Sequence, residues 1–381
     1  MRRISANYIY TGVSKPIKNG VVSIDDDGVV IEVSSQRKGD EEVFEGVICA
    51  GFVNVHCHTE LSFAKDKIER NTGIDDFISS LEKLKRSIGE DEKKKAAKEA
   101  FVEMQKNGIV AVGDIMNTSI SLEAKEESEL EIYNFIEVFG SQYKDAEKIW
   151  YNALGLSEEV KGRKNIVPHA PYSLSRTLFQ KIRDFQKQDS TISIHYMESE
   201  AEAEYFFKGT GSITDRYNKW GMDIPPFIPT HQRPINSIAS FLTQSDRVLL
   251  IHNTFITKED IDFAEENFKN TYYGLCPNAN LYIENELPDV KTLRKFNIDI
   301  CLGTDSFASN NSLSILEEMK TIQKNFDVSL EELIKWATIN GAKALGMEKT
   351  IGSIEVGKSP GLLLLKVEGE GESVEELEVI F

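Results

Sequence analysis

The 381-residue chain has an ordinary globular composition, with 40% hydrophobic and 28% charged residues, and a net charge of -18 at pH 7. This acidic balance disfavours a nucleic-acid backbone or an anionic membrane surface as a partner. The sequence also lacks an apolar run of the roughly 20 residues that a membrane-spanning helix needs. We therefore expect a cytoplasmic protein with no nucleic-acid or membrane partner.

Both ends of the sequence have β character. Residues 1–48 alternate short apolar runs with Asp/Gly turn signals, which predicts a small antiparallel β unit. The tail from Gly352 onward contains four consecutive leucines, at 362–365, and ends in a second apolar run. We expect residues 1–48 and 349–381 to form one small composite β-sandwich domain.

Residues 49–348 alternate strand-like apolar runs with amphipathic stretches of helical period, such as 91–107 and 330–345. This alternation is typical of parallel β/α units. Eight strands are expected, at residues 50–58, 109–116, 132–140, 165–171, 192–198, 247–254, 271–277 and 299–306. Eight strands close a (β/α)₈ barrel, whose catalytic groups gather at the C-terminal strand ends. The predicted fold class is therefore α/β, a TIM barrel with an attached β-sandwich.

Five of the six histidines stand at or near the ends of predicted strands. His56 and His58 are two residues apart on the first strand, so strand alternation turns both imidazoles to one face. Cys57 is expected to point to the opposite face, away from an ion bound there. An H-x-H pair by itself is weak evidence for a metal site.

Two further residues strengthen the hypothesis of a metal site. His195 lies at the end of the fifth strand, and Asp305 lies at the end of the eighth, which barrel closure places beside the first. Three imidazole nitrogens and one carboxylate suit zinc or ferrous iron, with a position left open for water. The alternative for Asp305 is a helix cap, but the apolar run before it favours a buried functional carboxylate.

Two residues are candidates for acid–base chemistry beside that ion. Glu198 follows His195 by three residues, where the strand leaves the barrel, so its carboxyl group can carry protons between water, a ring nitrogen and a leaving amine. His252, at the end of the sixth strand, can polarise the same water or stabilise an oxyanion. The competing interpretations are an exposed acid for Glu198 and a core histidine for His252.

The remaining histidines are assigned less directly. His169 is a candidate hydrogen-bond donor to the substrate, and His231, in a Pro-rich loop, is assigned to structure or to a lid.

The order of the motifs resembles the amidohydrolase superfamily, in particular its chlorohydrolase and purine-deaminase branch. The resemblance is carried by His56-Cys57-His58-Thr59-Glu60-Leu61-Ser62, His169-Ala170-Pro171-Tyr172-Ser173, His195-x-x-Glu198, His252 and Leu302-Gly303-Thr304-Asp305-Ser306. Within the branch, the sequence is most similar to aminodeoxyfutalosine deaminases in Glu60-Leu61-Ser62, Gly209-Thr210-Gly211, Cys276-Pro277-x-x-Asn280 and Ala308-Ser309-Asn310.

The resemblance implies a metal-dependent hydrolytic deaminase that acts on an adenine-type nucleoside or a related aminated heterocycle, such as aminodeoxyfutalosine. No lysine stands at the end of the fourth strand, where binuclear relatives place a bridging lysine, so one divalent ion is expected, zinc or alternatively iron. The expected metal ligands are His56, His58, His195 and Asp305. The expected catalytic residues are Glu198, His252 and Asp305, and the expected substrate contacts are Glu60, His169 and Ser306.

Other functions are compatible with the same motifs. A guanine deaminase or a triazine-type chlorohydrolase or aminohydrolase would use the same metal-assisted attack by water on a ring carbon. A catalytically dead binding barrel is the alternative outside the enzymes, and the complete set of expected ligands argues against it. By analogy with the family, a homo-oligomer is also compatible with the sequence.

Overall fold

The computed structural model describes residues 1–222, 230–243, 245–368 and 373–381. Neighbouring strands of the barrel are parallel and pair in chain order, β8 to β11 in one sheet and β12 to β15 in another. Within the described residues, the eight barrel strands are β8 (Phe52–Cys57), β9 (Ile109–Met116), β10 (Glu131–Val138), β11 (Arg163–Pro168), β12 (Thr191–Tyr196), β13 (Arg247–His252), β14 (Thr271–Leu275) and β15 (Asp299–Leu302). They are buried along most of their length, as expected for parallel strands covered on both faces.

Hydrogen bonds near the C-terminal strand ends join the two sheets into a closed barrel. On one side, the amide of His195 donates to the carbonyl oxygen of His169 at 2.8 Å. On the other side, the amides of Thr304 and Asp305 donate to the carbonyl oxygen of His56 at 3.2 and 3.0 Å. The predicted barrel is confirmed, and both closures lie where the predicted site residues stand.

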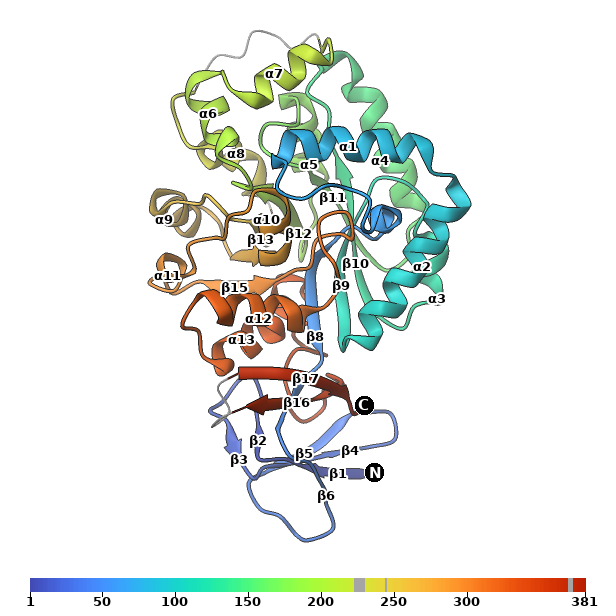
Figure 1. Cartoon of the computed structure of the whole chain (residues 1–381), viewed down its shortest axis with the longest axis vertical. Coiled ribbons are helices and arrows are strands. Elements are labelled where there is room, and N and C mark those ends of the chain that lie inside the picture. Colours follow the sequence, from blue (N-terminus) through green and yellow to red (C-terminus); the bar gives the residue numbers. More distant parts are fainter. Residues whose placement is uncertain (223–229, 244, 369–372) are drawn as a thin grey trace.

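Helices cover the outside of the barrel, and α1 crosses the end that lies away from the small β unit (Figure 1). The bounds are α1 (Gly73–Ser87), α2 (Glu90–Lys106), α3 (Leu122–Glu127), α4 (Ala146–Glu159), α5 (Arg176–Phe185), α6 (Glu200–Lys208), α7 (Ser212–Lys219), α8 (Pro234–Leu242), α9 (Lys258–Asn267), α10 (Pro277–Ile283), α11 (Val290–Leu293), α12 (Ile315–Asn325), α13 (Leu330–Ala337) and α14 (Ile339–Ala344). Short 3₁₀ turns occupy Thr59–Ala64 and Tyr143–Asp145. No helix among the described residues is long and apolar enough to cross a membrane.

The helix predicted over 330–345 is instead two helices, α13 and α14, divided at Thr338. The backbone of Thr338 leaves the helical region, with φ -131° and ψ -92°, and its hydroxyl donates to the carbonyl oxygen of Ile334 at 2.6 Å. The break lets α14 lie directly against β8. A Cβ atom on Gly341 would stand 3.0 Å from Val53, so this glycine permits the close approach.

The two chain ends form two sheets packed around one apolar core, as predicted. The first sheet has the order β5 (Val30–Ser34), β4 (Val21–Ile24), β1 (Arg2–Ser5) and β6 (Glu42–Val43). The second has the order β17 (Ser373–Val379), β16 (Leu362–Glu368), β7 (Val47–Ala50), β2 (Tyr8–Ile9) and β3 (Ile17–Lys18). Buried residues of both sheets share a cluster that includes Ile4, Val22, Ile48 and Leu364. The exact domain bounds predicted from the sequence stay a prediction.

The predicted first barrel strand, 50–58, is divided at Gly51 between two sheets. Residues 47–50 form β7, which pairs with β16 and β2, and the barrel strand β8 begins at Phe52. The chain therefore passes from the small β unit into the barrel at one glycine. A Cβ atom there would stand 2.8 Å from the carbonyl oxygen of Pro360 and would also overlap Val110.

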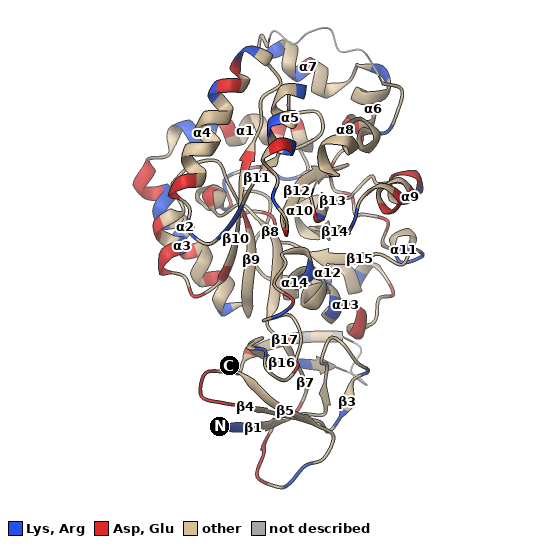
Figure 2. Cartoon of the chain, turned by 180° about the vertical axis from the view of Figure 1, so that it is seen from behind, with Lys and Arg blue, Asp and Glu red and all other residues tan. Residues whose placement is uncertain are grey.

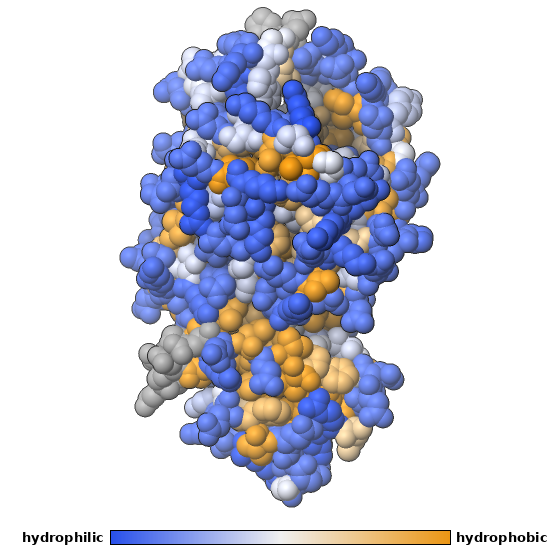
Figure 3. All heavy atoms as spheres, turned by 45° about the vertical axis from the view of Figure 1, so that its right-hand side comes forward, coloured by the Kyte–Doolittle hydropathy of each residue, from blue (hydrophilic) through white to orange (hydrophobic). Residues whose placement is uncertain are grey.

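Charged residues of both signs cover the outer helices, with acidic side chains prominent on α4 and α9 (Figure 2). From the side, the surface is mostly hydrophilic, and apolar residues gather in the lower part of the molecule, where the small β unit lies (Figure 3).

We predict that Gly51→Ala lowers the free energy of unfolding by about 1–3 kcal/mol, because the new methyl group meets backbone on one side and Val110 on the other. The matched control is Gly155→Ala in α4, where a Cβ atom would have nothing within 4 Å and where alanine favours the helix by about 0.5–1 kcal/mol. Denaturant unfolding of both variants measures the difference. Equal stability of the two variants would contradict the described junction.

Candidate metal centre and active site

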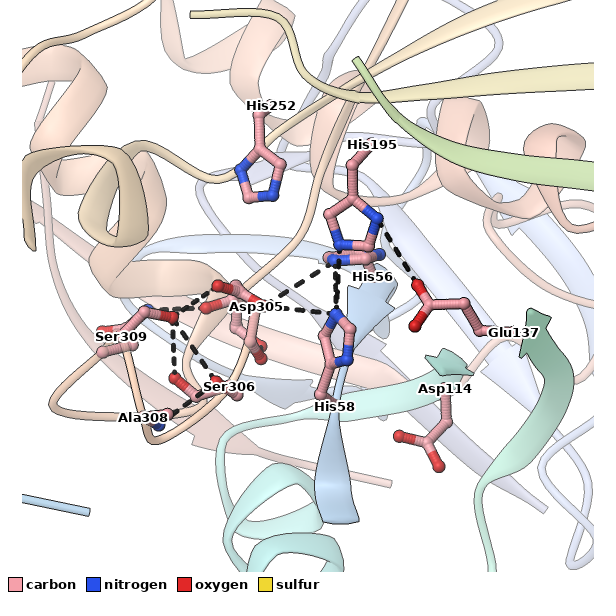
Figure 4. A network of polar contacts seen from close by, with 12 residues as sticks. His56, His58, Asp114, Glu137, His195, His252, Asp305, Ser306, Ala308 and Ser309 are labelled. Carbon is pink, nitrogen blue, oxygen red and sulfur yellow. Dashed lines mark hydrogen bonds and ion pairs between the residues drawn. The ribbon is translucent and has the colours of Figure 1, made fainter. Parts of the chain in front are cut away.

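The C-terminal ends of β8, β12 and β15 bring three histidines and an aspartate together (Figure 4). Nε2 of His58 lies 3.1 Å from Nε2 of His56 and 3.3 Å from Nε2 of His195. Oδ1 of Asp305 lies 3.7 Å from Nε2 of His56 and 3.6 Å from Nε2 of His58. All four residues are buried. The structure thus brings together the four residues that the sequence predicted as ligands.

The electrostatics of this cluster suit a cation. Burial lowers the pKa of His58 to about 3 and lowers the pKa values of His56 and His195 well below the usual range, so the three imidazoles are neutral. Nδ1 of His195 donates to the carbonyl oxygen of His169 at 2.8 Å, which leaves the lone pair on Nε2, facing the other three residues. Nitrogen lone pairs and a carboxylate that face one another repel unless a cation lies between them. The donor set fits a divalent ion such as zinc.

Strand alternation places Cys57 away from this cluster. Its side chain is buried, it pairs in register with Asp114 of β9, and its thiol lies beside Thr304. Among the described residues, the groups whose donor atoms converge for a metal contain no cysteine. All four cysteines of the sequence are described, buried and unpaired.

Asp305 lies three residues beyond the end of β15, so the predicted strand 299–306 ends earlier than expected. Asn54 holds this segment: its side-chain amide donates to Oγ1 of Thr304 at 2.8 Å, and its side-chain oxygen accepts from the amide of Thr304 at 3.1 Å. The hydroxyl of Ser309 donates to Oδ2 of Asp305. The helix-cap alternative for Asp305 is wrong, because the next helix, α12, is capped by Ser314.

Several residues at or just beyond the ends of the barrel strands adopt positive φ angles that favour glycine. They are Met197 (49°), His252 (76°), Asn253 (56°) and Asp305 (55°). Such angles are costly outside glycine and persist only where surrounding contacts hold them. The side chain of Asn253 supplies two of these contacts by donating to the carbonyl oxygens of Leu250 at 2.8 Å and Gly274 at 3.1 Å. These turns end β12 and β13 before the predicted limits of 198 and 254, and they direct side chains into the barrel mouth.

Glu198 is buried, so its interpretation as an ordinary exposed acid is wrong; the neighbouring Glu200 is exposed. Oε1 of Glu198 lies 3.6 Å from Nε2 of His252. Burial raises the pKa of Glu198 well above its usual range, and the charges of Asp305 and Glu284 raise it further. The carboxyl group therefore holds its proton to unusually high pH.

The carboxyl group of Glu202 fixes the backbone that carries Glu198. It accepts hydrogen bonds from the amides of Met197 at 3.1 Å, Glu198 at 2.8 Å and Ser199 at 3.4 Å. Sequence reasoning did not single out Glu202. The signal was present, because Ser199-x-x-Glu202 is the capping-box pattern that begins a helix.

His252 is buried, and a hydrogen bond to Asn280 fixes the orientation of its ring. Nδ1 of His252 donates to the side-chain oxygen of Asn280 at 2.9 Å, so Nε2 faces Glu198. Sequence reasoning assigned Asn280 no role beyond its place in a motif. Its contact with His252 depends on how α10 packs, which no local pattern shows.

A cavity of about 760 Å³ opens beside the cluster, between α1, α7 and the loops that follow β9, β10 and β11. Its wall includes His58, Glu137 and His169. His169 is bonded through Nδ1 to Oγ of Ser173 at 3.0 Å, and its ring centroid lies 4.7 Å from that of His195. Sequence reasoning did not identify Glu137 as a site residue, and burial raises its pKa to about 8.

A second hollow lies at the N-terminal ends of β10 and β11, and none of these residues lines it.

The other predicted substrate contacts, Glu60 and Ser306, accept hydrogen bonds from loop residues of the protein itself. The carboxyl group of Glu60 accepts from the amide of Asn117 at 3.0 Å and from the hydroxyl of Thr118 at 2.9 Å. Oγ of Ser306 accepts from the amide of Ala308 at 3.1 Å. His231 is exposed in the segment before α8. Substrate contacts by Glu60 and Ser306, and a lid role for His231, stay predictions.

A family model described as "Amidohydrolase family" matches residues 47–380. The chain belongs to the amidohydrolase family. This confirms the predicted family and the prediction of a hydrolase.

Among curated relatives, the aminodeoxyfutalosine deaminase of a Nitratiruptor species is 28% identical over 345 residues, which cover 87% of this chain and 82% of the relative. A solved structure of Helicobacter pylori aminofutalosine deaminase in complex with methylthio-coformycin matches with a TM-score of 0.82 at 22% identity, over 100% of this chain and 98% of that one. An adenosine deaminase from Xanthomonas campestris with bound zinc matches with a TM-score of 0.74 at 20% identity, over 95% and 84% of the chains. The two structures show that the fold is shared.

We predict that the purified protein binds about one divalent ion per chain and that His195→Ala lowers both metal content and turnover. Cys57→Ser should leave both nearly unchanged, because Cys57 lies on the other face of β8. Elemental analysis measures the metal content. Two tightly bound ions per chain, or loss of the ion in Cys57→Ser, would contradict the proposed geometry.

Proposed function

We propose that this protein is a metal-dependent hydrolytic deaminase that replaces the exocyclic amine of an adenine-type nucleoside with oxygen. The observation that carries the proposal is the buried Glu198 carboxyl group, with its raised pKa, facing His252 beside the cluster of three histidines and Asp305. A proton donor next to a cluster of metal-ligating groups is the arrangement that protonation of a ring nitrogen requires. The similarity to nucleoside deaminases supports the same assignment.

We assign His56, His58, His195 and Asp305 as the ligands of one ion, with zinc as the preferred metal and iron as the alternative. Zinc is favoured because its ligands in proteins are predominantly nitrogen, sulfur and carboxylate donors in fourfold arrangements, and because the solved adenosine deaminase of the same fold contains zinc. When bound, a divalent ion lowers the pKa of water and so supplies a nucleophile at neutral pH.

The side chains around the cluster handle the protons of the reaction. Glu198, whose pKa burial raises well above its usual range, donates a proton to the ring nitrogen next to the carbon under attack, which makes that carbon more electrophilic. Asp305 accepts a proton from the attacking water and passes it to the departing amine. His252 orients the water through Nε2, because Asn280 holds its Nδ1. The hydroxyl group of the tetrahedral adduct returns its proton to Glu198 as the carbon–nitrogen bond breaks and the carbonyl forms, so the net change consumes one water and releases one ammonia.

The cavity favours a nucleoside over a bare ring. Ligand pockets for small molecules span about 300–1,000 Å³, and the cavity of about 760 Å³ extends well beyond the histidine cluster, to α1 and α7. A guanine or triazine ring would leave most of this space unfilled. His169 is assigned to the substrate because it lies on the wall next to His195.

We also propose a cytoplasmic location for this enzyme. The four cysteines are buried and unpaired, which is the usual state of cysteines in a reducing compartment.

For the oligomeric state, we propose a homo-oligomer by analogy with the family.

We predict that Glu198→Gln lowers turnover by about 10²–10⁴-fold with metal content unchanged, because glutamine keeps the shape but cannot transfer a proton. Glu200→Gln is the matched control, since Glu200 is an exposed acid two residues later. Steady-state ammonia release and elemental analysis measure the two effects. The assigned role would be wrong if Glu198→Gln kept its rate or lost the metal.

A substrate screen tests the proposed reaction itself. We predict that the metal-replete protein releases ammonia from adenosine derivatives, with aminodeoxyfutalosine and S-adenosylhomocysteine included, faster than from guanine or aminotriazines. If the protein preferred guanine or a triazine, the nucleoside assignment would be wrong and the alternative substrate class would take its place. No activity on any of these compounds would favour a non-catalytic barrel.

A further inference from the structure

A buried ion pair contacts the residue that follows the proposed ligand His58. Asp114, on β9, and Lys125, on α3, have side chains that are 0% and 7% exposed, and Oδ2 of Asp114 lies 2.7 Å from Nζ of Lys125. The same carboxylate accepts hydrogen bonds from the amide of Thr59 at 2.9 Å and from its hydroxyl at 2.8 Å. Burying two charges is costly and is often no gain in stability, so such a pair calls for another role.

The pair is fully engaged within the fold. Besides Asp114, the ammonium group of Lys125 donates to the side-chain oxygen of Asn134 at 2.8 Å and contacts the sulfur of Met116 at 3.3 Å. The three donors of the ammonium group therefore each have a partner. Both oxygens of Asp114 also accept hydrogen bonds. The pair thus acts on Thr59, and it offers no vacant donor to a ligand.

The ring of His58 lacks the support that the ring of His195 has. Nδ1 of His195 donates to the carbonyl oxygen of His169. Among the described residues, hydrogen-bond contacts of the His58 ring join it only to His56 and His195, through Nε2, the atom that faces the other proposed ligands. Histidines that bind a metal are usually oriented by a hydrogen bond from their second ring nitrogen. The direction of the His58 ring therefore depends on its backbone.

Regular strand pairing does not fix the backbone of His58. The strand β8 ends at Cys57, and its pairing with β9 is irregular between Asn54 and Cys57. A 3₁₀ turn begins at Thr59, directly after His58. Asp114 holds both the amide and the hydroxyl of Thr59, and Figure 4 shows Asp114 beside His58, on the neighbouring strand. A rotation of the His58 backbone would strain both hydrogen bonds.

We propose that Asp114, paired with Lys125, is a positioning residue of the metal centre, which fixes Thr59 and thereby aims the imidazole of His58 at the ion. The inference rests on the proposed function, because it presupposes an ion bound by His58. Lys125 balances the charge of Asp114, so the effect on the ion is mainly one of geometry. Asp114 itself is not a ligand, because its oxygens are engaged by Thr59 and Lys125.

The first test is the metal affinity of Asp114→Asn, measured by competition with a chromophoric zinc chelator. Asparagine keeps the shape and can accept from the amide of Thr59, but its NH₂ group faces the ammonium of Lys125, which is also a donor. We expect the affinity for zinc to fall by about 10–100-fold, as loss of a supporting contact behind a metal ligand typically causes.

The matched control is Glu41→Gln, which also replaces a buried, ion-paired carboxylate by its amide. The side chain of Glu41 is 1% exposed, pairs with Arg3 and accepts hydrogen bonds from the amides of Lys38 and Gly39. It belongs to the small β unit, away from the barrel end that α1 crosses (Figure 1). We expect Glu41→Gln to keep the zinc affinity of the parent within about twofold, even if it lowers the thermal stability.

A second pair of variants tests the same contact from the side of Thr59. Thr59→Val keeps the shape and the amide but removes the hydroxyl that donates to Asp114, and we expect it to weaken zinc binding by about three- to tenfold. Thr59→Ser retains the hydroxyl and should bind zinc within about twofold of the parent. Circular dichroism checks folding, and if Asp114→Asn does not fold, the two Thr59 variants decide the test.

The visible spectrum of the cobalt-substituted protein provides a readout that a purely structural role would not change, because it reports the geometry of the ligands. We expect Asp114→Asn to alter the bands of bound Co²⁺ and Glu41→Gln to leave them unchanged. The inference would be overturned by parent-like affinity and spectrum in folded Asp114→Asn, or by equal affinities of Thr59→Val and Thr59→Ser. If the parent itself bound neither zinc nor cobalt, the proposed function would fail instead, so the two failures are distinguishable.

Discussion

The site depends on closure of the barrel between β8 and β15, because the proposed metal ligands stand on both sides of that seam. His56 and His58 belong to the first strand and its exit, and Asp305 follows the last. Asn54 exchanges hydrogen bonds with Thr304 across the seam. The carbonyl oxygen of His56 accepts hydrogen bonds from the backbone amides of residues 304 and 305. These hydrogen bonds fix the carboxylate of Asp305 next to the segment that carries His56 and His58, the two histidines that it faces.

Burial then sets the protonation state of the groups that the seam gathers. It keeps the three imidazoles neutral, so that each can offer a lone pair, and it raises the pKa of Glu198, so that its carboxyl group can donate a proton. One physical effect therefore suits both the proposed metal ligands and the proposed proton donor to their roles. The outer cavity differs, since Lys85 keeps partial contact with solvent and Arg216 pairs with Asp75.

The predictable part of the site follows from strand periodicity and barrel geometry. The period of two turned His56 and His58 inward, and the common C-terminal edge of the barrel brought His195 and Asp305 to them. Contacts made across the fold were not predictable, such as the support of His252 by Asn280, because they depend on how separate loops pack. Strand ends were predicted too late, since the positive φ angles after β12 and β13 have no signature in hydrophobic patterning.

The central claim is that one divalent ion is bound by three imidazoles and a carboxylate from both sides of the barrel seam. The most direct measurement is anomalous X-ray diffraction from crystals of the metal-replete protein. We expect one strong anomalous peak within about 2.0–2.3 Å of the side-chain ligand atoms of His56, His58, His195 and Asp305. A peak ligated by Cys57, a second peak of equal height nearby, or no peak at this position would contradict the account.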